Sequence, residues 1–185
     1  MIKLDEQVLC HAKDQQGEVE CSEHKGYLID DAGGLAEKLG FHNAMLSKVD
    51  YFRRQEADIQ LIELTDLAEV AIDCHQTFNQ LCEERRRQGR LSGKEQKALR
   101  RQAWQIVTDE LKLKWNGSIA VIERLLRKNK EIKLEPNYEL LIVCKNHTDV
   151  QVLDGLKGLL AGMMGRVSIC TTKDVEEWLL GSNIL

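Results

Sequence analysis

The chain has 185 residues, of which 43% are hydrophobic and 30% charged, and its formal net charge is −4. This composition is typical of one globular domain and excludes a disordered chain, and no apolar run in the sequence is long enough to span a bilayer. The N-terminal stretch "MIKLDEQVLC" lacks the apolar core and cleavage site of a secretion signal. We therefore expect a cytoplasmic protein whose six cysteines are reduced and buried.

The first segment, residues 1–32, alternates polar and apolar residues around "DQQG", which predicts a β-hairpin with its turn near Gly17. This segment also contains residue types that bind zinc, but their spacing matches no usual zinc finger, and neighbours on a strand point to opposite faces. The residues concerned are Cys10, His11, Cys21 and His24. We interpret them as two buried cysteines and two surface histidines.

A short helix that ends at Gly40 is predicted next, followed by strands around residues 48–53 and 58–64. Each strand carries an acid, Asp50 or Glu63, although strands prefer β-branched and aromatic residues and a buried charge needs a partner or a metal. Residues two apart on a strand share a face, so Lys48 points the same way as Asp50. Pairing of the two strands would bring both acids together.

The pattern from residue 66 to residue 129 favours helix, with polar breaks at "GRLSG" and again at Asn116 and Gly117. Ser92 is the expected N-cap of the second helix, with Glu95 as its capping-box partner. Residues 85–101 carry eight basic side chains against one acid, which suits either contact with phosphates or a solvated helix face.

Residue pairs in this helical region also include Cys74 and His75, which are the residue types of a thiol nucleophile and its base. Adjacent helical positions lie about 100° apart, however, and no orienting acid is evident. We therefore interpret Cys74 as a core cysteine.

The C-terminal part of the chain alternates strands and helices. "YELLIVCKN", residues 138–146, is a short apolar run that predicts a buried strand. A helix in "VQVLDGLKGLLAGMMG", a strand in "RVSICTT" and a closing helix in "KDVEEWLL" follow. This alternation predicts an α/β layered fold in which the last two strands are parallel.

The stretch "KVDYF", followed about a dozen residues later by "LIELTDL", resembles the motif of the restriction-endonuclease-like superfamily, the PD-(D/E)xK nucleases, and the order of the elements agrees over residues 33–172. The resemblance implies an α/β fold with a restriction-endonuclease-like mixed central sheet flanked by helices, plus a long helical insertion. We expect a single domain, residues 1–185. Its parts are a hairpin at 1–32, a nuclease-like core at 33–67 and 136–185, and the insertion at 68–130.

By this resemblance, Asp50 and Glu63 hold Mg²⁺ or Mn²⁺, and the main-chain carbonyl of Leu64 is a third ligand. A hard divalent cation prefers such oxygen ligands and activates water for attack on a phosphate. The family's motif lysine is replaced here by Thr65, and Lys48 is expected to take over its role. Residues expected to contact nucleic acid are Gln76, Gln80, Arg85, Arg86, Arg87 and Arg90.

Glu37 on the first short helix corresponds to an acid that some members of the superfamily supply, although a glutamate there is more often only solvated. The sequence therefore suggests a metal-dependent nuclease acting on DNA phosphodiesters, with or without surviving catalysis, of a type common in genome defence. The alternative is a non-catalytic interaction module whose helical insertion mediates dimerisation or partner binding. In that case Asp50 and Glu63 would pair with Arg53 or Arg54, or face water.

Overall fold

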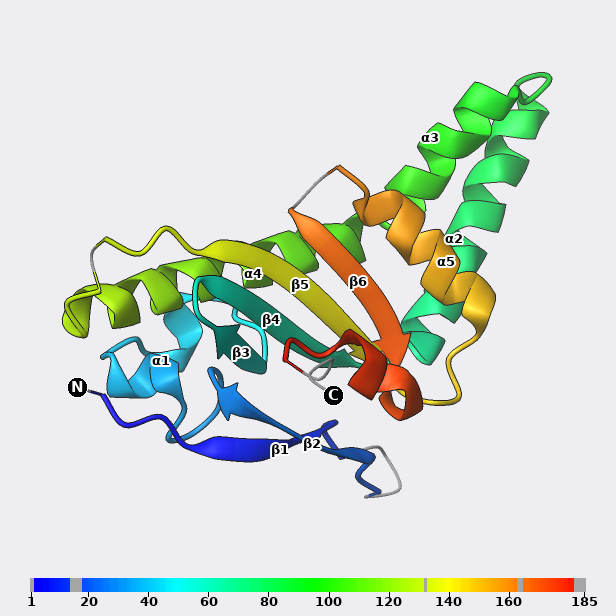
Figure 1. Cartoon of the computed structure of the whole chain (residues 1–185). Helices are drawn as coiled ribbons and strands as arrows, with labels where there is room; N and C mark the ends of the chain where they lie inside the picture. Colours follow the sequence, from blue (N-terminus) through cyan, green and yellow to red (C-terminus); the bar gives the residue numbers. More distant parts are fainter. Residues whose placement is uncertain (1, 14–17, 132, 163–164, 182–185) are drawn as a thin grey trace.

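The computed structural model describes residues 2–13, 18–131, 133–162 and 165–181, and over these residues the protein is an α/β fold built on one mixed sheet (Figure 1). The sheet order is β1-β2-β3-β4-β5-β6. Strands β1 to β4 pair antiparallel, while β4, β5 and β6 are parallel. The strands are β1 (Glu6–Cys10), β2 (Cys21–Leu28), β3 (Tyr51–Gln55), β4 (Asp58–Thr65), β5 (Asn137–Cys144) and β6 (Arg166–Thr171). The predicted α/β class and the parallel pairing of the last two strands are confirmed.

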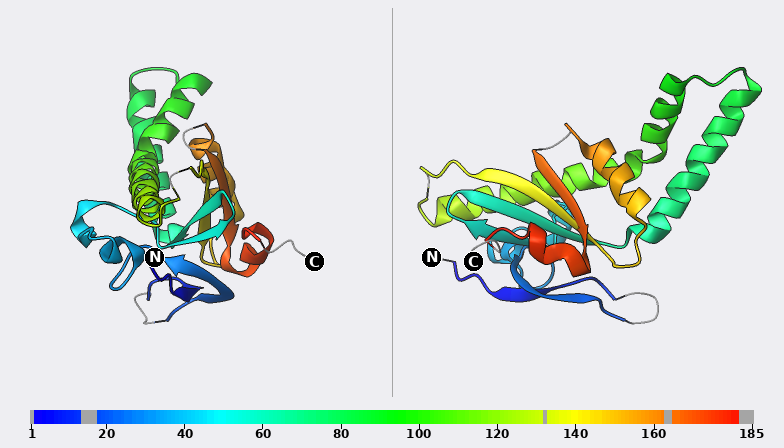
Figure 2. Two further views of the ribbon diagram at one scale, coloured as in Figure 1. Left: turned by 60° about the vertical axis from the view of Figure 1, so that its left-hand side comes forward. Right: turned by 45° about the vertical axis from the view of Figure 1, so that its right-hand side comes forward.

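The α-helices pack on the face of the sheet that carries the larger hydrophobic cluster or extend beyond the edge of the sheet, and a 3₁₀ turn near the C-terminus packs on the other face. In chain order they are α1 (Leu35–Lys38), α2 (Leu67–Arg87), α3 (Gly93–Ala103), α4 (Gln105–Lys128) and α5 (Val150–Leu160), with 3₁₀ turns η1 (Asn43–Met45) and η2 (Thr172–Trp178). Helices α2 and α3 extend away from the sheet as an arm, whereas α4 runs along the sheet (Figures 1 and 2). None of the helices within the described ranges is long and apolar enough to cross a membrane.

Strand β4 shows how the sheet separates two hydrophobic clusters. Ile59 and Leu61 pack into the larger cluster, which includes the buried side of α4. Ile62 belongs to a smaller cluster on the other face, formed with the β1–β2 hairpin and η2, and Leu64 packs against it. Alternate β4 residues thus lie on opposite faces of the sheet, and Glu63 lies on the face that α4 covers, where it meets Lys114.

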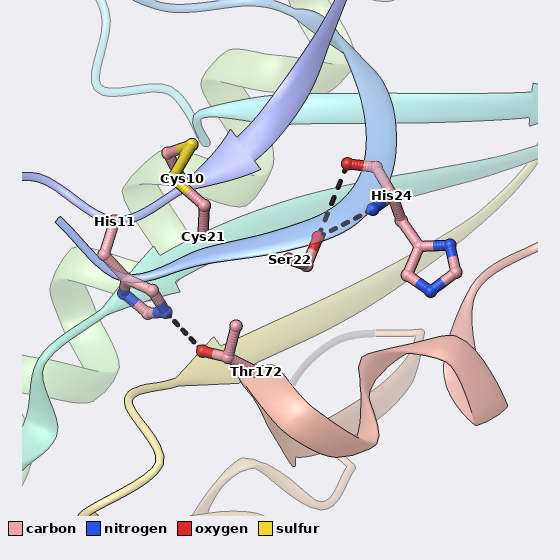
Figure 3. Close-up of a disulfide and its surroundings, with 6 residues drawn as sticks. All are labelled: Cys10, His11, Cys21, Ser22, His24 and Thr172. Carbon is pink, nitrogen blue, oxygen red and sulfur yellow. Dashed lines mark hydrogen bonds between the residues drawn. A yellow bond between two sulfur atoms is a disulfide. The ribbon is translucent and has the colours of Figure 1, made fainter.

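The N-terminal hairpin forms as predicted, but its cysteines differ from the prediction. Cys10 and Cys21 are register partners on β1 and β2 and form a disulfide with an S–S distance of 2.14 Å (Figure 3). Their predicted reduced, buried state is therefore wrong. His11 is also buried rather than exposed, and its ring forms a hydrogen bond with the hydroxyl of Thr172. The predicted turn at Gly17 lies outside the described residues.

The helical insertion has one predicted break and one that is misplaced. Helices α2 and α3 separate at the expected polar stretch, and the Ser92 capping box is present. The chain instead bends again at Trp104, and α4 continues without interruption through Gly117. That glycine allows close approach: a Cβ there would lie 2.0 Å from the carbonyl oxygen of Ser47. Its role is packing rather than helix termination. The closing segment also differs from prediction, since it forms the 3₁₀ turn η2.

Candidate functional site

Asp50 and Glu63 lie side by side at one end of the sheet. The antiparallel β3–β4 register ends at the pair of Tyr51 and Ile62, and Asp50 comes directly before Tyr51 while Glu63 comes directly after Ile62. The Oδ2 atom of Asp50 accepts a hydrogen bond from the backbone N–H of Leu64 at 2.8 Å, which fixes the carboxylate against β4. The sequence-based expectation that the two strands bring these acids together agrees with this geometry.

A lysine from the helical insertion completes the cluster. The Nζ atom of Lys114, on α4, lies 2.5 Å from Oε1 of Glu63 and 3.6 Å from Oε1 of Glu110. Lys114 follows Glu63 by 51 residues, so no short motif connects them. One signal in the sequence does point to it. Lys114 lies one helical turn from the buried residues Leu111 and Ser118, and a lysine on a buried helix face needs an anionic partner.

Lys48, the residue expected to replace the motif lysine, is 2% exposed and contacts Asp30 and Leu46. Its Nζ lies 3.1 Å from Oδ1 of Asp30 and donates to the carbonyl of Leu46 at 2.9 Å. Asp30 in turn contributes to raising the pKa of Asp50. The structure therefore surrounds Asp50 and Glu63 with Lys114 on one side and the Lys48–Asp30 pair on another.

The protonation of Glu63 is strongly perturbed. Burial, reinforced by the negative charge of Asp50, raises the pKa of Glu63 to about 8, even though Lys114 opposes the shift. Burial likewise raises the pKa of Asp50, against the hydrogen bond from Leu64 and the charge of Lys114. For Lys114, burial lowers the pKa, but the attraction of Glu63 and Asp50 outweighs it, so the net shift is upward. Lys114 therefore stays charged at neutral pH.

The donor set suits a hard cation. The Oε2 atom of Glu63 is buried and has no hydrogen-bond partner within the described part of the chain, a costly state that a bound cation would relieve. In an extended strand the N–H and C=O of one residue point toward the same neighbour, so the carbonyl of Leu64 faces the Asp50 side along with its N–H. Over the described ranges, no group of three or more His, Cys, Asp or Glu residues is arranged to hold a metal. Any cation here would thus depend on two carboxylates and a main-chain oxygen.

The other sequence-predicted site residues do not join this cluster. Thr65 is partly buried at the end of β4. The carboxylate of Glu37 accepts a hydrogen bond from the N–H of Gly33 at 2.6 Å, close to its own helix. Arg85 pairs with Glu95, which ties α2 to α3. Exposed side chains on or just after α2, along the arm in Figure 1, are Gln76, Gln80, Arg86, Arg87 and Arg90.

The contacts in the structure also bear on three other interpretations of the sequence: pairing of the strand acids with arginine, a reactive Cys74 and a zinc site. Arg54 pairs with Glu131, so the predicted pairing of the strand acids with Arg54 is wrong. Cys74 is buried, and burial raises the pKa of its thiol, as expected for a core cysteine. Around the hairpin, the ring of His24 points away from the disulfide while His11 points to Thr172 (Figure 3), so these residues form no zinc site.

A second charged cluster lies where the parallel strands end. The Nζ atom of Lys145, which follows β5, lies 3.0 Å from Oδ2 of Asp66, and Nε2 of His147 lies 3.4 Å from Oδ1 of the same carboxylate. Asp66 is also the N-cap of α2 and accepts from the N–H of Ala68. Burial raises the pKa of Asp66, but the bonds from Lys145 and Ala68 outweigh it, and the net pKa is below its ordinary value.

A cavity of about 450 Å³ opens beside Asp50. It lies between the β1–β2 hairpin and the ends of the central strands. Its lining residues are Cys10, Ala12, Leu28, Asp30, Asp31, Asp50, Tyr51 and Leu64. This cavity gives Asp50 a route to solvent, in contrast to Glu63, which is 4% exposed.

Comparison of the chain with protein-family models, with curated proteins and with solved structures gave no match.

Proposed function

We propose that this protein is a metal-dependent nuclease acting on DNA phosphodiesters, with Asp50, Glu63 and Lys114 at its catalytic centre. The observation that carries this proposal is the buried, unpartnered Oε2 of Glu63, placed beside a second carboxylate and a charged lysine. A buried carboxylate oxygen without a hydrogen-bond partner is unfavourable for stability alone, and such groups concentrate at functional sites. The resemblance of the motif and of the element order to the PD-(D/E)xK nucleases supports the same reaction class.

Each side chain has a distinct role in this proposal. Asp50, Glu63 and the carbonyl of Leu64 would hold Mg²⁺ or Mn²⁺, which when bound neutralises phosphate charge and lowers the pKa of water. The hydrogen bond from the Leu64 N–H keeps Asp50 in place before any ligand arrives. Glu63 must release its proton to bind a cation, so we expect cation affinity to rise with pH up to about 8.

Lys114 takes the role that the resemblance assigns to the motif lysine. Its ammonium lies against Glu63, and its raised pKa keeps it protonated. It therefore acts as a positive charge and hydrogen-bond donor toward phosphate or water rather than as a general base. A lysine supplied from α4 explains how the strand position can hold Thr65. The arm of α2 and α3, with its exposed arginines, would contact the DNA backbone.

A non-catalytic module is the second candidate, and one specific contact favours it. Lys114 already satisfies Oε1 of Glu63, and a buried lysine–carboxylate pair can serve only to position α4 on the sheet. In that case the projecting arm of α2 and α3 would bind another protein or a second copy of the chain.

The decisive experiment combines cation titration with cleavage assays. We expect calorimetric heat with Mn²⁺ or Mg²⁺ and cleavage of plasmid or single-stranded DNA by the intact chain. Asp50→Asn and Glu63→Gln should lose both, while Lys114→Met should lose cleavage by at least about 100-fold and retain cation binding.

Lys112→Met is the matched control for the lysine, because Lys112 lies on the same helix and pairs with Asp109 at the surface. It should cleave like the unmodified protein. A folded protein that shows no cation heat and no cleavage would exclude the nuclease and leave the interaction module.

A further inference from the structure

The β1–β2 hairpin forms one wall of the cavity that leads to Asp50. Cys10 and Ala12 supply this wall, and Asp50 and Leu64 lie on the sheet side of the cavity. Leu9, the neighbour of Cys10, packs into the smaller hydrophobic cluster under the sheet. The hairpin is therefore seated on the sheet, and any ligand that reaches Asp50 through this cavity must pass beside it.

Contacts on both strands hold this wall in place. The disulfide links Cys10 to Cys21 across the hairpin, and the next residue, His11, bonds through Nε2 to Oγ1 of Thr172 at 3.0 Å (Figure 3). Directly before β2, the carboxylate of Glu20 accepts a hydrogen bond from the backbone N–H of Asn146 at 3.1 Å. The wall is thus attached to the segments that follow both β5 and β6.

The size and lining of the cavity limit what can enter. A cavity of about 450 Å³ is of the size that holds one small ligand. Its walls combine carboxylates, which accept from the amino groups of bases, with apolar side chains such as Leu28. No basic side chain is among the lining residues in the described part of the chain, so the recess suits a base or sugar better than a phosphate.

Duplex DNA is poorly matched to such a recess. It stays nearly straight over roughly 150 base pairs and keeps its bases stacked inside, so it cannot place one nucleotide into a narrow cavity without unpairing it. A single strand has no such cost, since its bases are already free to turn out of the chain. Asp50 can thus meet a nucleotide of a single strand where it cannot meet one in a stacked helix.

We infer that the hairpin wall makes the proposed nuclease selective for single-stranded DNA over duplex DNA. This inference rests on the proposed function. It assigns the β1–β2 hairpin a role in substrate selection, separate from the cation-binding role of Asp50 and Glu63.

The test compares initial cleavage rates of one labelled oligonucleotide, alone and annealed into a blunt duplex, with Mg²⁺ or Mn²⁺ present. We expect the single strand to be cut at least about tenfold faster. Equal rates, or faster cutting of the duplex, would overturn the inference and leave the proposed nuclease intact. Cleavage of neither substrate would overturn both.

A loosened wall provides the second measurement. Cys21→Ser combined with Glu20→Ala removes the disulfide and the bond to Asn146, and Glu23→Ala on the same exposed strand is the control. The loosened variant should still cut the single strand while its preference falls several-fold, and the control should keep the full preference. An unchanged preference in the loosened variant would overturn the role of the hairpin.

Because the loosened variant could misfold, the preference for single-stranded DNA is also compared between the oxidised and the reduced unmodified protein. A dithiol reduces the disulfide by exchange, forming two protein thiols while the dithiol becomes a cyclic disulfide. Cys21 is exposed and accessible to this attack. Reduced protein should show a smaller preference than oxidised protein, and an identical preference in both would count against the wall.

Discussion

Two lysine–carboxylate pairs lie near the same end of the sheet, and their burial is reversed. In the Lys114–Glu63 pair the carboxylate is the deeply buried partner, with 5% of its side chain exposed against 22% for the lysine. In the Lys145–Asp66 pair the lysine is buried at 8% and the carboxylate is exposed at 36%. The pKa of Glu63 is raised to about 8, whereas the pKa of Asp66 is lowered.

The two pairs differ in how well the hydrogen-bonding needs of the carboxylate are met. Asp66 accepts from Lys145 and from the N–H of Ala68, and by capping α2 it anchors the arm. Glu63 retains one oxygen without a partner and lies beside the charge of Asp50. A pair that serves stability should resemble Lys145–Asp66, and a pair that is kept despite its energetic cost should resemble Lys114–Glu63.

The largest expected effect is the pH dependence that Glu63 imposes. Its pKa is 4.5 in the unfolded chain and about 8 in the folded one, so between these values the folded state binds more protons. Stability should therefore fall as pH rises through this window, by up to roughly 5 kcal/mol. Glu63→Gln should remove most of the slope, as measured by urea unfolding at about pH 5 and about pH 8.

Glu110→Gln is the control for that measurement, because Glu110 is exposed and lies near the same lysine, Lys114, on α4. It should leave the slope nearly unchanged. If Glu63→Gln also left the slope intact, the two lysine–carboxylate pairs would not differ in the way described.

The second prediction concerns the packing of α4, the helix that carries Lys114. Gly117→Ala places a methyl group against the carbonyl of Ser47 and should destabilise the protein by about 3 kcal/mol despite its better helix propensity. Gly155→Ala on α5 is the control, since a Cβ there meets no atom within 4 Å, and it should be neutral or slightly stabilising. Thermal unfolding measures both, and equal effects would contradict the close approach.

A smaller effect is expected at the second pair. Asp66→Asn keeps a good N-cap for α2 but removes the charge that faces Lys145, and should cost about 2 kcal/mol of unfolding free energy. Asp149→Asn tests capping alone, because Asp149 caps α5 through Gln151, and should cost much less. A larger loss in Asp149→Asn would show that the ion pair contributes little.

The smallest effect concerns the arm that Asp66 anchors. Replacing Arg86, Arg87 and Arg90 together with alanine should weaken binding of single-stranded DNA and make its salt dependence shallower, by roughly 2 in the log–log slope. Arg166→Ala, an exposed arginine at the start of β6, should leave that slope unchanged. Fluorescence anisotropy at several salt concentrations distinguishes them, and an unchanged slope in the triple variant would exclude the arm from DNA contact.

The sequence pattern predicts helices and strands well where interactions between residues close in the sequence determine them. The strand alternation in β4, the capping box at Ser92 and the parallel β5–β6 pair all follow from side-chain period and short-range hydrogen bonding. The pattern predicts a helix break at Gly117 because glycine lowers helix propensity. The contact that requires it comes from Ser47, far away in the sequence.

The α/β class and the placement of Asp50 and Glu63 on neighbouring strands follow from the residue pattern alone, because strand pairing at short separation leaves few alternatives. The contact of Lys114 with Glu63 follows only from the tertiary structure, because it depends on how α4 packs against the sheet, and packing between distant segments leaves no short motif in the chain. The bond between Cys10 and Cys21 depends instead on the register of the hairpin, which the alternating pattern of the sequence does not specify.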